Sequence, residues 1–274
     1  GIIAVVKAFA DAPAAKAGVK NGDIIYKVKG KEVTGVDINN VVTEMKGEKG
    51  TTVDITVYRE SEKKYIDFTI TRDQVNEPTV EYKMLDKKKK IGYIQISQFE
   101  EVTYDQFTKA LDDLKKQGMK AVIFDVRSNP GGLYETVCKM LDEILPEGNL
   151  VSTKDKYGNE EKQTSDSKCL DMPMVVLQNK DSASASEIFA GAIQDFDAGK
   201  IVGTQSFGKG IVQTILPLSD GSAVKLTVQD YYTPSGKNIH GKGITPDVEA
   251  ELEENATNDT QLEKAKETIM ELMK

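Results

Sequence analysis

The sequence predicts a two-domain chain, in which a small, partly open β-barrel at residues 1–73 precedes an α/β domain at residues 74–274. The length of 274 residues suits two domains of average size. The first domain consists of short alternating apolar runs separated by glycine turns, which is typical of β-strands. From about residue 91, buried strand-like runs alternate with amphipathic helical segments, which indicates parallel strand pairing.

The composition argues against a disordered chain and against a nucleic-acid-binding protein. With 39% hydrophobic and 29% charged residues, the chain is typical of a globular protein rather than a disordered one. Its net charge of −8 argues against nucleic acid as the main partner, because binding phosphates requires a basic surface. The lysine run at 87–90 is the local exception, and we interpret it as a solvated hairpin tip.

Other classes are excluded or left open by simple counts. Two cysteines are too few for a disulfide scaffold, and neither has a neighbour that suggests a metal site. No apolar run reaches the roughly 18 residues of a transmembrane helix. The chain opens inside a strand-like run, so we interpret it as a fragment and conclude nothing about its compartment from this end.

Turn and helix-cap residues separate the predicted helices and strands of the first domain. Pro13 is placed to begin a short helix and Gly18 to end it. A turn at 21–23 precedes the strand "IIYKV", and apolar residues at helical spacing predict a second helix that Gly47 ends. Two alternating runs, 50–60 and 63–72, predict a pair of strands.

In the second domain, residues 74–90 carry proline and charge and predict a connector followed by an edge hairpin. Strands and helices then alternate. The predicted strands are 91–99, 120–126, 172–180 and 199–207, with further strand character at 221–236, and the predicted helices are 103–118, 133–145, 184–196 and 259–274.

The stretch "SASASE" stands where a buried strand meets a helix. Ser184 and Glu187 fit a capping box, and the local sequence by itself favours that interpretation. The position after a strand changes the balance, because a serine at such a turn can be an exposed nucleophile beside backbone N–H groups and the helix dipole.

A serine nucleophile requires a base. His240 is the one histidine of the chain and would have to serve in a Ser-His-Asp triad. The alternative is a lysine that burial keeps uncharged. Lys209 lies between two glycines and apolar runs, and Gln213, four residues later, could orient its amine. A solvent-facing lysine in a simple turn is the competing interpretation of "FGKG".

A peptidase also requires hydrogen-bond donors for the oxyanion. The run "DVRSNPGG" ends a predicted strand in Gly131 and Gly132, which suits the aiming of N–H groups at a developing negative charge. A plain turn after a strand explains the same residues.

Two resemblances organise these observations. "PAAKAGVKNGDIIYKVKGKEV" with "VVTEMKGEKGTTVDITVYR" resembles a PDZ domain of the kind attached to proteases, although its usual first strand and carboxylate-binding loop would precede Gly1. "FDVRSNPGGL", "SASASEIFAGAIQD", "GTQSFGKGIVQ" and "YTPSGKNIHGKGITPDV" resemble the carboxyl-terminal processing peptidases, or tail-specific proteases, of serine peptidase family S41.

The second resemblance implies roles for particular residues. The family nucleophile falls on Ser184, its general base on Lys209 and its assisting glutamine on Gln213. The oxyanion donors fall on the N–H of Ala185 and of one glycine in "NPGG", either Gly131 or Gly132.

The resemblance also implies a crotonase-like α/β core at about 91–240, with a β-rich cap from 74–90 and the C-terminal part. It implies an ATP-independent serine endopeptidase that cuts near substrate C-termini, set outside the cytoplasm as a tethered or secreted protein. Protein or peptide substrates with exposed C-termini would occupy the PDZ domain and the cleft. No metal or organic cofactor is implied, and a homodimer or an activating partner protein is compatible with it. The rival hypotheses are a catalytically silent PDZ adaptor and a hydrolase that uses His240.

Overall fold

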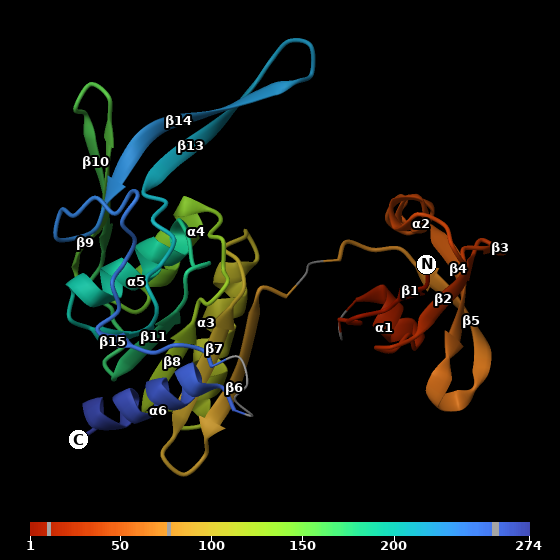
Figure 1. The fold of residues 1–274 in the computed structure, drawn as a ribbon, viewed down its shortest axis with the longest axis horizontal. Helices are drawn as coiled ribbons and strands as arrows, with labels where there is room; N and C mark the ends of the chain where they lie inside the picture. Colours follow the sequence, from red (N-terminus) through yellow and green to blue (C-terminus); the bar gives the residue numbers. More distant parts are fainter. Residues whose placement is uncertain (10–11, 76–77, 254–257) are drawn as a thin grey trace. The chain divides into compact units, whose positions relative to one another are not determined.

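The computed structural model describes residues 1–9, 12–75, 78–253 and 258–274. It divides into two units, Gly1–Pro78 and Thr79–Lys274 (Figure 1). The border predicted between residues 73 and 74 lies inside the first unit, and residues 76–77 of the predicted connector lie outside the described residues. No helix in the described part of the chain is long and apolar enough to span a bilayer.

The first unit is an antiparallel sheet with two helices. Its strands pair in the order β1-β2-β4-β5, and β3 pairs with β2. Helix α1 begins with a proline and ends where Gly18 adopts a φ of 105°, as the sequence predicts. The elements are β1 Ile3–Ala4, α1 Pro13–Ala17, β2 Ile24–Val28, β3 Lys31–Glu32, α2 Ile38–Met45, β4 Thr52–Arg59, a 3-10 turn Glu60–Glu62, and β5 Lys64–Thr71.

The core of the second unit is a six-stranded sheet of order β15-β12-β11-β8-β7-β6. All neighbouring strands are parallel except β6 and β7, which form an antiparallel pair. The central strands β8 and β11 are buried at every residue, which is typical of a parallel sheet covered on both faces. The bounds are β6 Val80–Asp86, β7 Ile91–Ile96, β8 Ala121–Asp125, β11 Met174–Gln178, β12 Gly199–Gly203 and β15 Val248–Glu249.

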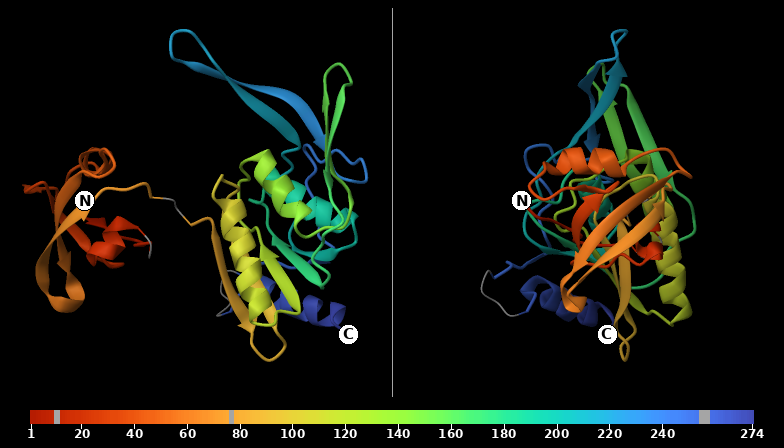
Figure 2. Two further views of the ribbon diagram at one scale, coloured as in Figure 1. Left: turned by 180° about the vertical axis from the view of Figure 1, so that it is seen from behind. Right: turned by 90° about the vertical axis from the view of Figure 1, so that its right-hand side faces the viewer.

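Helices cover both faces of this sheet (Figure 2). On one face α3 (Thr103–Lys116), α4 (Tyr134–Asp142) and α5 (Ala185–Asp195) pack around Phe124 and Phe189, whose rings meet edge to face at 5.4 Å. On the other face α6 (Thr260–Leu272) packs through residues that include Ala265 and Ile269. The result is an α/β sandwich of three layers.

A second, four-stranded antiparallel sheet of order β10-β9-β14-β13 lies above α5 in Figure 1. Its strands are β9 Gly148–Asp155, β10 Glu160–Ser165, β13 Ile211–Pro217 and β14 Ala223–Tyr232. The cap was predicted instead from residues 74–90 and the C-terminal part, and this is wrong. Residues 80–86 form β6, which pairs with β7 inside the core sheet and packs its buried Val80 into the hydrophobic core. In the C-terminal part, β15 and α6 also belong to the layers of the core.

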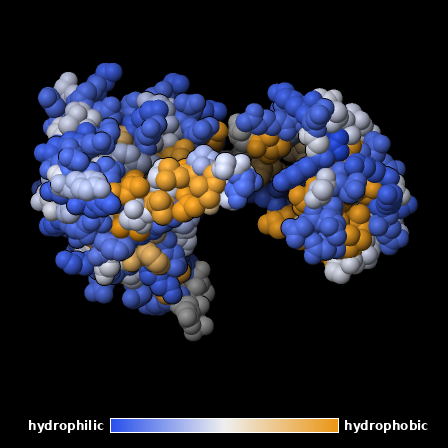
Figure 3. Space-filling view, turned by 90° about the horizontal axis from the view of Figure 1, so that it is seen from above, coloured by the Kyte–Doolittle hydropathy of each residue, from blue (hydrophilic) through white to orange (hydrophobic). Residues whose placement is uncertain are grey.

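The hairpin of β13 and β14 extends beyond the rest of the second sheet (Figure 1). Seen from above, apolar side chains gather over it (Figure 3). Between 38% and 64% of the surface of each of these side chains is exposed: Ile215, Leu216, Leu218, Val224, Leu226 and Val228. The lysine run at 87–90 forms the turn between β6 and β7, as predicted.

A buried ion pair joins β4 to the segment between α1 and β2 in the first unit. Arg59 donates to both carboxylate oxygens of Asp23, each at 2.8 Å, and to the carbonyl of Gly18 at 2.8 Å. Only 1% of the Asp23 side chain is exposed. The hydrogen bonds from Arg59 hold the pKa of Asp23 below its ordinary value.

We expect Asp23→Asn to loosen the first unit selectively, because it removes the buried partner of Arg59 and leaves this guanidinium with only the more exposed Glu62 as its ion-pair partner. Amide hydrogen exchange should speed up about tenfold or more in β2 and β4 and stay unchanged in β8 and β11. The lowered pKa makes the contribution of Asp23 to stability present above its ordinary pKa and lost as pH falls through the lowered value. Acid should therefore loosen this unit less in Asp23→Asn than in the wild type, and equal acid sensitivity would contradict the prediction.

Candidate active site

Three loops meet at one edge of the core sheet. We call them the glycine loop (126–132, after β8), the serine turn (179–184, after β11) and the lysine loop (204–210, after β12). These three strands are parallel neighbours, so their carboxyl ends lie at the same edge, where α/β sheets commonly bind ligands.

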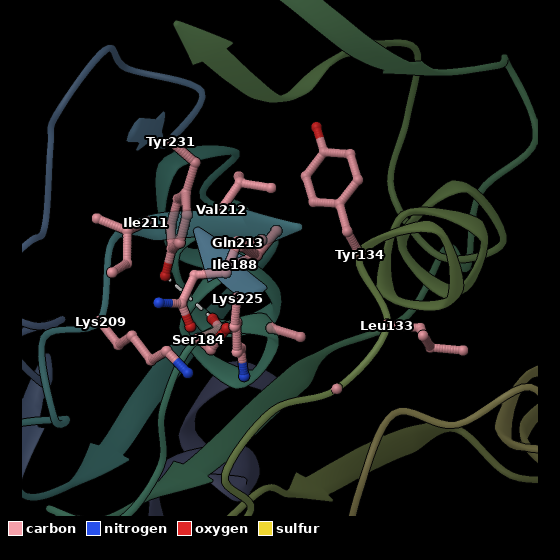
Figure 4. A pocket seen from close by; sticks show the side chains of 12 residues that line it. Leu133, Tyr134, Ser184, Ile188, Lys209, Ile211, Val212, Gln213, Lys225 and Tyr231 are labelled. Carbon is pink, nitrogen blue, oxygen red and sulfur yellow. Dashed lines mark hydrogen bonds between the residues drawn. The ribbon is translucent and has the colours of Figure 1, made fainter. Parts of the chain in front are cut away.

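The loops and β13 enclose a pocket of about 220 Å³ (Figure 4). Of the residues predicted for the site, all but Gly131 line it, and Gly131 lies directly behind Ser184. The lining is Gly132, Leu133, Tyr134, Ser184, Ala185, Ile188, Lys209, Ile211, Val212, Gln213, Lys225 and Tyr231.

The three serines of "SASAS" occupy different environments. Ser182 is buried and its hydroxyl donates to the carbonyl of Val126 at 2.8 Å. Ser186 is also buried and donates to the carbonyl of Asn129 at 2.9 Å. Both therefore fasten the serine turn and α5 to the glycine loop. Ser184 is half-buried and lines the pocket.

The backbone at Ser184 is strained. Its φ of 58° and ψ of −116° lie in a region that residues with a Cβ seldom adopt. Such conformations cost about 1–3 kcal/mol and persist where the surroundings enforce them, often at functional sites. A sharp strand-to-helix turn of this kind exposes a serine hydroxyl at the top of a sheet.

Glycine is required beside this turn. A Cβ on Gly131 would stand 2.8 Å from both Ser184 Cβ and the carbonyl oxygen of Ala183. A Cβ on Gly132, whose φ is 144°, would stand 2.1 Å from the carbonyl oxygen of Phe99. The two glycines thus let two backbone segments pack directly against the serine turn and the segment after β7.

The predicted oxyanion donors can now be told apart. The N–H of Gly131 donates to Asn129 Oδ1 at 2.8 Å. Within the described residues, no hydrogen bond uses the N–H of Gly132 or of Ala185. Both of these residues line the pocket, so the geometry favours Gly132 over Gly131 as the partner of Ala185.

Close backbone packing positions the lysine loop. A Cβ on Gly208 would stand 3.0 Å from the backbone nitrogens of Lys242 and Gly243, and one on Gly210 would stand 2.7 Å from that of His240. Lys209 is held between these glycines, half-buried, with its amine directed toward Ser184 in Figure 4.

The side chains of the predicted catalytic group are close together but not joined. Among the described residues, no hydrogen bond links Ser184 Oγ to Lys209 Nζ or Lys209 to Gln213. Gln213 is exposed on β13, and its amide donates to Thr227 Oγ1 at 3.4 Å instead. His240 is exposed, and it is not among the residues that line the pocket.

Sequence reasoning assigned Glu187 a capping role only. Its side chain is fully buried and accepts four hydrogen bonds, from the N–H of Ser184 (2.8 Å), Gly208 (2.7 Å) and Lys209 (2.8 Å), and from Ser206 Oγ (2.6 Å). The glutamate of the capping box was a visible signal, but nothing in the local pattern places the lysine loop on it.

Two further pocket residues come from β14 and carried no sequence signal. The hydroxyl of Tyr231 donates to the carbonyl of Ser184 at 3.1 Å (Figure 4). Burial, with the Glu187 carboxylate nearby, raises the pKa of Tyr231 well above its ordinary value, so this hydroxyl stays a donor. Lys225 is exposed and brings a second amine to the pocket. In the described part of the chain, no cluster of three or more His, Cys, Asp or Glu could hold a metal ion.

Comparison with known proteins gives the same two units. Residues 90–250 match the model of peptidase family S41, and residues 1–70 match that of the PDZ domain. A carboxy-terminal-processing protease of Bartonella bacilliformis is 42% identical over 258 residues, covering 91% of this chain and 58% of that protein. A relative from Staphylococcus epidermidis is 40% identical to this chain, which covers 50% of the length of that relative. The chain therefore spans about half the length of such curated relatives.

A solved structure, the photosystem II D1 C-terminal processing protease, is 31% identical, with a TM-score of 0.60 over 98% of this chain and 72% of that one. The tricorn protease, at 20% identity and a TM-score of 0.54, shares the fold, covering 100% of this chain and 28% of that one. The family match extends over every strand of the core sheet except β6 and over all three loops, and the identity to a carboxy-terminal-processing protease exceeds 40%. The chain therefore belongs to peptidase family S41, in the group of C-terminal processing serine proteases, and its first unit is a PDZ domain.

Proposed function

We propose that this chain is an ATP-independent serine endopeptidase that cuts protein substrates near their C-termini through a dyad of Ser184 and Lys209. The observation that carries the proposal is the separation of the three serines. Ser182 and Ser186 are buried and bonded, whereas Ser184 faces the pocket from a strained turn beside Lys209.

The geometry suits acyl transfer. Ser184 Oγ would attack the scissile carbonyl while Lys209 Nζ takes its proton. The N–H groups of Gly132 and Ala185 would bind the oxyanion, at the positive end of the α5 dipole. Lys209 would then protonate the leaving amine, and water would hydrolyse the acyl-enzyme with the same lysine as base.

The missing contact between Ser184 and Lys209 is compatible with this role, since catalytic hydrogen bonds often tighten only when substrate is bound. A lysine side chain has the torsional freedom to close the gap. Gln213, on the strand that forms one wall of the pocket, would orient the amine after a change of rotamer.

The PDZ domain has a cavity that suits the binding of a C-terminal segment. It contains an apolar cavity of about 530 Å³ whose lining includes Val5, Ile25 and Val42. We propose that this cavity takes an apolar C-terminal segment of a substrate or partner and that its occupancy regulates cleavage. By analogy with the family, the protein would act outside the cytoplasm, tethered or secreted, with no cofactor, and a homodimer or an activating partner remains compatible with this function.

Ser184→Ala should abolish cleavage of an unfolded protein substrate, lowering kcat by about 10,000-fold or more, because the covalent nucleophile is lost. Ser182→Ala and Ser186→Ala should lose thermal stability but keep measurable turnover, since each loses only an anchoring hydrogen bond. Quantitative peptide release and melting curves provide both values. Wild-type turnover in Ser184→Ala would refute the nucleophile.

Lys209→Ala and Lys209→Arg should both be inactive, because a guanidinium keeps its proton and cannot act as a base. His240→Ala should retain most of its activity, since His240 is exposed and lies outside the pocket lining. The two sets of variants should be assayed on the same unfolded substrate at the same pH. An active Lys209→Ala together with an inactive His240→Ala would establish the histidine rival instead.

Val42→Asp should weaken binding of an apolar C-terminal peptide to the PDZ domain about tenfold or more, because a charge then faces the apolar cavity. Val36→Asp is the matched control, since Val36 is equally exposed (39% against 38%) but does not line the cavity. The added peptide should change the rate of cleavage in the wild type and in Val36→Asp but not in Val42→Asp. Rates that the peptide leaves unchanged in all three proteins would exclude regulation by the PDZ domain.

A further inference from the structure

We infer that Glu187 is a positioning residue, which fixes the backbone of the nucleophile and the backbone of the base relative to each other; this inference rests on the proposed Ser184–Lys209 function. One oxygen, Oε2, accepts from the N–H of Ser184 and from the N–H of Lys209, both at 2.8 Å. A single atom therefore bridges the two residues whose side chains must exchange a proton.

The other carboxylate oxygen of Glu187 also binds residues of the lysine loop. Oε1 accepts from the N–H of Gly208 at 2.7 Å and from Ser206 Oγ at 2.6 Å. Ser206 Oγ in turn accepts from the N–H of Ile244 at 2.6 Å, so the chain of bonds reaches the segment that packs behind the lysine loop. The four acceptor positions of the carboxylate are thereby filled by four donors.

An ordinary capping box does not explain this arrangement. A glutamate at the third position of a helix normally caps one N–H from a solvated surface. The Glu187 side chain is 0% exposed, and three of its four donors come from a loop about twenty residues further along the chain. A buried carboxylate is costly unless it is fully bonded, so the donors have few alternative arrangements.

Other contacts between the two loops are weaker constraints on the reacting groups. One backbone bond joins the N–H of Phe207 to the carbonyl of Ser182 at 3.0 Å. It holds the neighbours of Ser184 and Lys209 rather than these residues themselves. Glu187 is thus the direct connection between the two, and an error of about 1 Å in such a connection can cost about a hundredfold in rate.

Glu187→Gln keeps the size of the side chain and replaces one acceptor oxygen by an NH₂ group. Whichever oxygen is replaced, the NH₂ then faces at least one backbone N–H of the lysine loop, that of Lys209 or that of Gly208, so this loop is expected to move away from the serine turn. We expect kcat to fall about a hundredfold with KM changed by less than about threefold. Measurements should use the full chain and an unfolded substrate, at a temperature well below the melting point of each variant.

Gln194→Ala is the matched control. Gln194 lies at the other end of α5 and also fastens this helix to a loop, through the carbonyl of Thr245 at 3.0 Å, and within the described residues no hydrogen bond joins its side chain to Ser184 or to the lysine loop. It should lower stability without changing kcat. An equal loss of kcat in Gln194→Ala and Glu187→Gln would show a general effect of loosening α5 and would overturn the positioning role.

A double-mutant cycle separates positioning from support of the fold. The rate of acylation by a p-nitrophenyl ester should be followed in the wild type, Glu187→Gln, Lys209→Ala and the double variant, because the leaving group of this activated ester needs no proton and leaves a residual rate to measure when Lys209 is absent. Without Lys209 there is no base left to position, so Glu187→Gln should cost less than about fivefold more. A further loss of about a hundredfold in that background would overturn the inference.

Ser206→Ala keeps the proposal testable if Glu187→Gln does not fold. It removes one of the four donors and should lower kcat about fivefold to tenfold with KM unchanged; wild-type kcat in this variant would overturn the inference. Ser184→Ala, assayed in parallel, distinguishes a failure of the proposed function from a failure of the positioning role of Glu187. An active Ser184→Ala refutes the proposed function, whereas an inactive Ser184→Ala beside a fully active Glu187→Gln refutes only the role of Glu187.

Discussion

A carboxylate placed inside a protein must find donors for all of its lone pairs, and at Glu187 this requirement organises the whole site. The donors available at the carboxyl edge of the core sheet are the N–H groups at the start of α5 and those of the lysine loop. Satisfying the charge therefore brings the two segments together. The glycine loop is attached separately, through Asn129, whose carbonyl accepts from the N–H of Ala183 and from Ser186 Oγ.

The second constraint is steric. Ser184 adopts its unfavourable φ because the segments on either side are fixed, by the bonds of Ser182 on one side and by α5 on the other. Gly131 then packs against the Cβ of Ser184 at a distance that no larger residue permits. Polar attachment and close packing act on the same residue from opposite sides, which explains how a strained turn can be stable.

Local signals in the sequence predicted much of this structure. Pro13 and Gly18 bound α1, and the alternation of strands and helices predicted the parallel core, because these patterns depend on neighbouring residues. The cap was misplaced, because whether 80–86 pairs with β7 or covers the site depends on contacts between distant segments. The site residues were proposed from motifs, and the pocket brings most of them together; the positions of Gln213 and Glu187 depend on β13 and the lysine loop and could not be predicted locally.

The pocket takes its walls from segments that are far apart in the chain, around Gly132, Ser184 and Lys209, with β13 and β14 completing it. None of these segments can form the site alone, because each is aligned by the parallel pairing of β8, β11 and β12. Such pairing joins residues that are distant in sequence, and it forms late and slowly in folding. A newly made or partly unfolded chain is itself an unfolded polypeptide, the kind of molecule this peptidase would cut. Because the pocket is assembled only when the core sheet is complete, a chain that is still unfolded holds no formed site and could not carry out the proposed cleavage on itself.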